Sequence, residues 1–216
     1  MLCFQASRKI LWRSDCWMAK ALAVFSAFGW PLLRALWARS VESSYFGNSM
    51  NLSISIAAEN DIPIITKIYN QAVVLRSATA DIHPVTIDSR KKWLQEHSPN
   101  QYPVYVAETQ NEIVGWCSLS AYRPGRMALG HTAEISYYVD ENFTGMGVGS
   151  AMISHAIENC DRLDIKTLFA IILDVNKDST RILEKFGFKK WGHLPNVADF
   201  DGRECGHLYY GFRVAS

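Results

Sequence analysis

Hydrophobic and polar residues follow two different periods along this chain, and these periods predict its elements. Residues alternate over Ser53–Ala57, which is typical of a half-buried strand. Apolar residues at helical spacing follow over 59–73, after an acidic and polar start that includes Pro63. A polar loop over 76–86 precedes a second helical pattern at 87–96. The first part of the patterned region therefore predicts a strand followed by two helices.

Strands dominate the next part of the pattern, and helices return after it. A glycine-rich loop at 144–150 opens an apolar helical pattern, and Gly187 is placed to end a later helix. The predicted strands are 104–107, 113–119, 132–139, 168–173, 188–194 and 207–214, and the later helix is 179–186. This order predicts an α/β (α+β) sheet with helices on both faces.

The loop after Val139 has the order of elements that binds a phosphate. A strand ends, three glycines follow at alternate positions, and a helix begins. Glycines let the backbone approach an anion, and the first N–H groups of a helix have no partner within it. We therefore predict a pyrophosphate cradle at 144–150, and a plain turn is the alternative. A Walker loop is disfavoured because no lysine precedes Ser150, and a dinucleotide fingerprint is disfavoured because four predicted strands come first.

Composition excludes several classes of partner. The 216 residues carry a net charge of +1, so no basic surplus suggests nucleic acid. The five cysteines are scattered without the spacing of a zinc site or of a disulfide framework. We expect no metal, no nucleic acid and reduced cysteines.

Residues 1–49 differ from the rest of the chain. They are basic and apolar, and they hold four of the seven tryptophans. Their longest uncharged run, Ala21–Leu33, is short beside the roughly 20 residues that span a membrane. A targeting segment, a membrane-surface helix and an extension outside the working protein are the three readings. We favour the third, with a domain at 50–216, a poorly packed or absent extension and no stable membrane insertion.

Two motifs in this order resemble the GCN5-related N-acetyltransferases, the GNAT family. The family signature, Gln/Arg-x-x-Gly-x-Gly/Ala, reads here from Thr144 to Gly149, with threonine in the first position. The second motif is Asn176 followed by a helix and Gly187-Phe188. The resemblance implies a GNAT fold with a mixed central sheet of about six to seven strands. It also implies acetyl-CoA as co-substrate, bound somewhat more weakly because Thr144 has no charge.

Three further segments resemble the phosphinothricin and methionine sulfoximine acetyltransferase branch: 68–73, 79–84 and 131–139. Ala80 and His83 depart from the pattern of the branch. The branch implies transfer of acetyl to the amine of a small amino-acid-like substrate by a cytoplasmic homodimer. An acetyltransferase of protein N-termini, polyamines or aminoglycosides is one alternative, and a non-catalytic acyl-CoA sensor is another.

The resemblance also assigns cofactor-binding residues. Backbone groups of Tyr137, Tyr138 and Val139 are expected to pair with the pantetheine arm, and Asn176 is expected to hydrogen-bond it. The predicted cradle consists of Thr144, Gly145, Met146, Gly147, Val148, Gly149 and Ser150.

Glu134 is the candidate general base, because burial in an apolar strand would raise its pKa toward a useful value. An ordinary outward-facing carboxylate is the alternative. Arg123 is placed to clamp a substrate carboxylate, and Arg126 is a weaker rival. The resemblance adds Thr79 and His83 to the substrate site.

Proton donation to the leaving thiolate has no assigned residue. The tyrosine that the family uses as general acid is replaced here by Leu183, which cannot donate a proton. Either the thiolate leaves unassisted, or a hydroxyl such as that of Tyr209 or Tyr210 serves.

Overall fold

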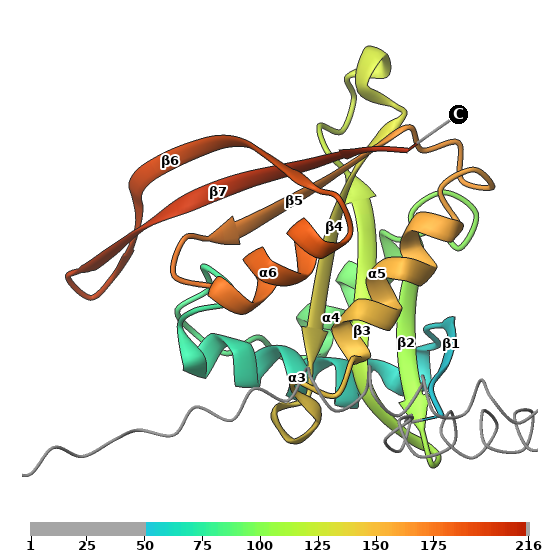
Figure 1. Cartoon of the computed structure of the whole chain (residues 1–216). Coiled ribbons are helices and arrows are strands. Elements are labelled where there is room, and N and C mark those ends of the chain that lie inside the picture. Colours follow the sequence, from blue (N-terminus) through green and yellow to red (C-terminus); the bar gives the residue numbers. More distant parts are fainter. Residues whose placement is uncertain (1–50, 215–216) are drawn as a thin grey trace, which may run out of the picture. The chain divides into compact units, whose positions relative to one another are not determined.

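The structure is a computed structural model and describes residues 51–214 (Figure 1). The predicted extension at 1–49 and the predicted domain boundary at Met50 lie outside the described residues. Within 51–214, no helix is long and apolar enough to cross a membrane. No cluster of three or more potential metal-ligating side chains occurs in the same range.

One seven-stranded sheet forms the centre of the described chain, in the order β1-β2-β3-β4-β5-β7-β6. Only β4 and β5 are parallel to each other, so the sheet is mixed. The strands are β1 (Ser53–Ile56), β2 (Val104–Thr109), β3 (Glu112–Ala121), β4 (Thr132–Val139), β5 (Thr167–Leu173), β6 (Lys189–Phe200) and β7 (Arg203–Arg213). Helices are α3 (Ile62–Leu75), α4 (Ile87–Gln95), α5 (Val148–Glu158) and α6 (Lys177–Lys185), with 3-10 turns η1 (Glu59–Asp61), η2 (Met127–Leu129) and η3 (Glu141–Phe143).

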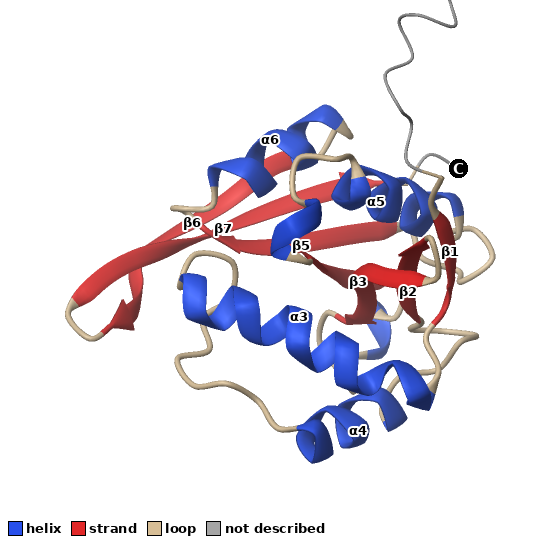
Figure 2. Ribbon diagram, turned by 90° about the horizontal axis from the view of Figure 1, so that it is seen from below, coloured by secondary structure: helices blue, strands red, loops and turns tan. Residues whose placement is uncertain are grey.

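Helices cover both faces of the sheet, as the sequence predicts (Figure 2). Helices α3 and α4 pack on one face, around the fully buried Trp116 of β3. On the opposite face, Met152 of α5 and Leu183 of α6 enter the larger core with Leu168 of β5. We call these the α3 face and the α5 face.

The final hairpin is longer than the sequence pattern predicted. The expected strands at 188–194 and 207–214 are the inner parts of β6 and β7, which continue to a tight turn at Asp201-Gly202. Both turn residues have positive φ, 55° and 92°, which suits the right-handed twist of a hairpin. The pairing of β6 with β7 contains two bulges, between Lys190 and Gly192 and between Leu194 and Ala198. At these bulges the side chains stop alternating between the two faces, so the sequence pattern does not predict the outer part of the hairpin. The Asp-Gly pair was the signal that could have found this turn.

Candidate active site

The two parallel strands β4 and β5 pair only at their beginnings. Their register ends at Glu134 opposite Phe169, although both strands continue (Figure 1). Hydrogen bonds from Asp140 N–H to Val114 O (2.9 Å) and from Tyr122 N–H to Thr132 O (3.3 Å) fix which residues bond to β3. Because an antiparallel ladder alternates, backbone groups of even-numbered β4 residues point to β3 and those of odd-numbered residues point to β5.

The backbones of Tyr137 and Val139 therefore face β5 beyond the last paired residues. The backbone of Tyr138 faces Trp116 in β3, and its ring packs edge-on against Tyr69 with centroids 4.9 Å apart. Of the three residues predicted to pair with pantetheine through the backbone, Tyr137 and Val139 have the required orientation. Tyr138 is part of the α3-face packing.

The glycine loop leaves an open backbone surface before α5. Gly145 and Gly147 have φ of 76° and 89°, and a Cβ at either residue would meet no atom within 4 Å. Gly149 differs, since a Cβ there would lie 3.6 Å from Ile182 and 3.8 Å from Tyr137. The first two glycines thus shape an exposed loop, and the third lets α5 pack closely.

No side chain caps α5, whose N-cap residue is Gly147. The N–H groups of Val148, Gly149 and Ser150 donate to no acceptor within the part of the chain that the structure describes. Thr144 turns its hydroxyl back to Glu141 O (3.1 Å), and Met146 is exposed. The arrangement can receive an anion.

Asp140 fixes this loop to the α3 face. Its carboxylate is buried and accepts hydrogen bonds from Asn142 and from Gln71 (3.1 Å), with the Lys67 ammonium 3.4 Å away. Burial alone would raise the pKa of Asp140, but these hydrogen bonds and Lys67 outweigh it and hold the pKa below its usual range. The anchor joins the end of β4 to α3.

Asn176 lies at the start of α6, where its side-chain oxygen accepts the Ser179 N–H at 3.0 Å. This capping bond uses the side-chain oxygen of Asn176. The side-chain NH₂ of Asn176 donates no hydrogen bond to another residue within 51–214. The predicted pantetheine contact is therefore compatible with the cap.

The Tyr137 hydroxyl lies buried near Ser179 and has no hydrogen-bond partner among residues 51–214. Burial raises the pKa of Tyr137 to about 12. A buried hydroxyl without a partner is unfavourable by about 1–3 kcal/mol, so a bound group that accepted this proton would relieve it.

Glu134 is half-buried on the α3 face of β4, at the last residue pair shared with β5. Burial raises the pKa of its carboxyl group. No hydrogen bond or ion pair joins this side chain to any other residue between 51 and 214. An unpaired, desolvated carboxylate is what a general base requires.

The predicted substrate residues occupy different surroundings. Arg123 is exposed and lies over the Tyr122 ring, with its guanidinium carbon 5.5 Å from the ring centroid. Thr79 is buried, and its hydroxyl bonds to the Tyr69 hydroxyl at 2.8 Å. His83 is exposed, and no hydrogen bond or ion pair within 51–214 joins it to the other predicted site residues.

The three residues considered for proton donation are also separated. Leu183 is fully buried in the α5-face core. Tyr210 points toward α6, where its hydroxyl donates to Glu184 at 2.9 Å. Tyr209 is on the opposite face of β7, the face that carries Glu134, so it is the better placed of the two tyrosines.

Sequence reasoning missed Arg90, a buried cation beside the substrate loop. Its guanidinium lies 4.2 Å from the Tyr69 ring centroid and 4.6 Å from that of Trp93, and its Nε has no partner within the described range. Desolvation lowers the pKa of Arg90. Arg90 and Trp93 are three residues apart in a predicted helix, and this spacing could have indicated that the two side chains pack together.

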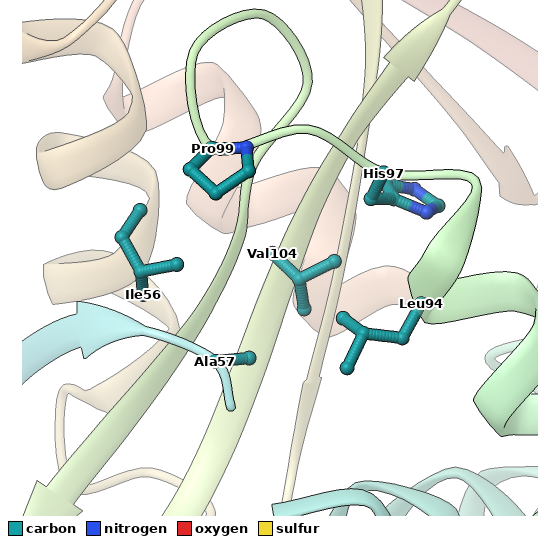
Figure 3. Close-up of a pocket in the computed structure, with 6 residues that line it drawn as sticks. All are labelled: Ile56, Ala57, Leu94, His97, Pro99 and Val104. Atoms are coloured by element: carbon teal, nitrogen blue, oxygen red, sulfur yellow. The ribbon is translucent and has the colours of Figure 1, made fainter. Parts of the chain in front are cut away.

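A small hollow elsewhere on the molecule is not this site. It has a volume of about 90 Å³ and is lined by Ile56, Ala57, Leu94, His97, Pro99 and Val104 (Figure 3). Ligand pockets are typically about 300–1,000 Å³, and none of the predicted site residues lines this hollow.

The fold and the site define an acetyltransferase of the GNAT type. Residues 54–208 match the family described as "Acetyltransferase (GNAT) domain", so this chain belongs to that family.

The chain is also similar to individual proteins of known name. The chain is 37% identical over 153 residues to YwnH of Bacillus subtilis, whose name gives it provisionally as a phosphinothricin acetyltransferase; the match covers 70% of this chain and 93% of that protein. It is 31% identical over 155 residues to the L-methionine sulfoximine/L-methionine sulfone acetyltransferase of Pseudomonas aeruginosa, covering 71% and 90%. The structure of yncA from Salmonella typhimurium with its cofactor acetyl-CoA superposes with a TM-score of 0.72 at 27% identity, covering 76% of this chain and 95% of that one.

Proposed function

We propose that this chain transfers an acetyl group from acetyl-CoA to the α-amine of a small amino-acid-like substrate. The observation that carries the proposal is the unpaired, desolvated Glu134 carboxylate at the point where β4 and β5 part. The same strand leads directly into the open glycine loop, so the candidate base and the candidate cofactor loop belong to one segment.

Acetyl-CoA fits the residues between β4 and α6. The space beside Gly145 and Gly147, the free N–H groups at the start of α5 and the unpaired Tyr137 hydroxyl suit a pyrophosphate joined to a polar arm. When bound, this co-substrate supplies an activated acetyl thioester. The loop 144–150 would hold its pyrophosphate, and Asn176 with the backbones of Tyr137 and Val139 would hold its arm.

Glu134 would remove a proton from the substrate ammonium, directly or through a water molecule. The amine is nucleophilic only after it loses this proton, and a carboxylate with a raised pKa is a better acceptor than an ordinary one. Arg123 would bind the substrate carboxylate and so orient the amine. The relatives' names support phosphinothricin, methionine sulfoximine or a similar amino acid as acceptor.

An assay of thiol release from acetyl-CoA tests the proposal. We expect turnover with methionine sulfone or phosphinothricin and little with spermidine, an aminoglycoside or an N-terminal peptide. Preference for one of those other amines would support the alternative acceptor class. Stabilisation by CoA without turnover of any amine would instead support a non-catalytic sensor.

The activity should depend on pH through Glu134. Its pKa is raised above the ordinary carboxyl value of 4.5 because the side chain is desolvated, and only the deprotonated form can act as base. We therefore expect kcat/KM to rise with pH along a limb whose midpoint lies above 4.5. Rate measurements from acid to neutral pH with a fixed amine check this, and a limb at or below that value would contradict it.

The resemblance also leads us to propose a cytoplasmic homodimer. Light scattering of the purified protein tests the assembly, and cell fractionation tests the location.

A further inference from the structure

Four aromatic side chains meet on the face of the sheet that carries Glu134. They are Tyr122, Phe169, Trp191 and Tyr209, which we call the aromatic wall. Phe169 is at their centre: the Tyr122 ring stacks on it with centroids 4.6 Å apart and planes at 9°, while Trp191 meets it edge-on at 5.1 Å and Tyr209 at 6.4 Å.

The wall lies on the same face of the sheet as the candidate base. Glu134 of β4 is opposite Phe169 of β5, and Phe169 is opposite Gly211 of β7. Residues that are opposite one another in neighbouring strands point to the same face. The Phe169 side chain is therefore the direct cross-strand neighbour of the Glu134 carboxylate, which explains how that carboxylate is desolvated without a polar partner.

Trp191 reaches the wall because Gly211 has no side chain. A Cβ at Gly211 would lie only 2.2 Å from the indole ring, so the ring occupies the space above this residue. Trp191 is the extra residue of the bulge between Lys190 and Gly192, which removes it from the regular alternation of β6. The bulge in β6 and the glycine in β7 together place the Trp191 indole over the sheet at Gly211.

Trp191 remains 48% exposed in this position. An exposed indole in contact with Phe169, the cross-strand neighbour of Glu134, is typical of a ligand or partner contact rather than of core packing. The wall also has a cation at one end, since the Arg123 guanidinium lies over the Tyr122 ring. A cation, an apolar surface and a base are the three groups needed to bind a carboxylate, an apolar side-chain end and an amine.

We propose that the aromatic wall, with Trp191 as its most exposed member, selects acceptors whose side chain ends in an apolar group. This inference rests on the proposed function, because it places the acceptor amine at Glu134. An amino acid with an apolar end buries that end against Phe169 and Trp191. A side chain of equal length that ends in a charged group, as glutamate does, would lose its hydration there without gaining a partner.

Glycine is the internal reference for the test, because it has the amine and the carboxylate but no side chain to contact the wall. In the wild type, kcat/KM should be at least about tenfold higher for methionine sulfone than for glycine or glutamate. Trp191→Ala should lower the value for methionine sulfone by about tenfold to a hundredfold and that for glycine by less than about threefold. Trp191→Phe, the matched control, should retain most of the preference.

Gly211→Ala gives an independent test, because it displaces the indole without removing it. We expect it to lower the preference about as much as Trp191→Ala does, and the double variant to lose no more than either single one. In the double variant the new Cβ no longer clashes with an indole. Comparing its thermal unfolding with that of Gly211→Ala shows whether the activity lost in Gly211→Ala comes from a folding defect. Equal loss for methionine sulfone and glycine in Trp191→Ala would overturn the inference.

Calorimetric binding to the CoA-loaded protein separates this inference from the proposed function. If the wild type binds methionine sulfone more tightly than glycine and Trp191→Ala abolishes the difference, the wall selects the ligand even if no amine is acetylated. If amines are acetylated but binding and turnover show no preference that depends on Trp191, the proposed function stands and the inference fails.

Discussion

Replacing Glu134 with glutamine should lower kcat by about 10²–10⁴-fold, the usual contribution of a positioned general base. Glutamine has nearly the same shape, but it cannot accept the proton of the ammonium group. Affinity for acetyl-CoA should change little, since the predicted cofactor contacts come from the β4 backbone, the loop 144–150 and Asn176. Steady-state kinetics with methionine sulfone and calorimetry with CoA measure the two effects.

The same variant should be more stable than the wild type at neutral pH. Burial raises the pKa of Glu134 in the folded state, so the charged form opposes folding, and stability is lost as pH rises through that pKa. Glutamine removes this pH-dependent loss, and the difference in melting temperature should disappear in acid. An unchanged kcat in Glu134→Gln would remove Glu134 from the mechanism, whatever its effect on stability.

Replacing Gly147 with valine should weaken CoA binding by at least about a hundredfold. Its φ of 89° disfavours a β-branched residue, and the new side chain would project into the open space where the pyrophosphate is expected. Calorimetric titration with CoA measures the loss of affinity.

Gly202→Val is the matched control for this substitution. Gly202 has a nearly identical φ of 92° and equally open surroundings, but it lies in the turn between β6 and β7. Both variants should therefore lose similar stability, about 1–3 kcal/mol. Only Gly147→Val should lose CoA. Equal CoA affinity in the two variants would show that the glycine loop does not hold the cofactor.

The sequence predicted this fold well because its elements have clear local periods. The strand at 132–139 and the strand–loop–helix order around Gly147 follow from the pattern alone. The last hairpin was predicted too short because its bulges at Lys190–Gly192 and Leu194–Ala198 interrupt the alternation. Periodicity detects regular pairing and cannot detect a strand that repeatedly changes register.

The candidate site was predicted in part for the same reason. Glu134 and the glycine loop lie in one continuous segment, so a sequence pattern can connect them. The aromatic wall brings together one residue just after β3 and residues of β5, β6 and β7 that are distant in sequence. The contact of Trp191 with Phe169, the neighbour of Glu134, depends on strand order and on an absent side chain at Gly211, and neither is visible in local composition.

The contact between Trp191 and Gly211 has an evolutionary consequence. Because any side chain at 211 would occupy the space of the indole, the two positions cannot diverge independently while the wall is kept. Lineages that lose the tryptophan are freed to acquire a larger residue at 211, and lineages that keep it are constrained to glycine. Reading these two positions together would therefore divide related sequences into two groups, and the division would mark where acceptor preference changed during descent.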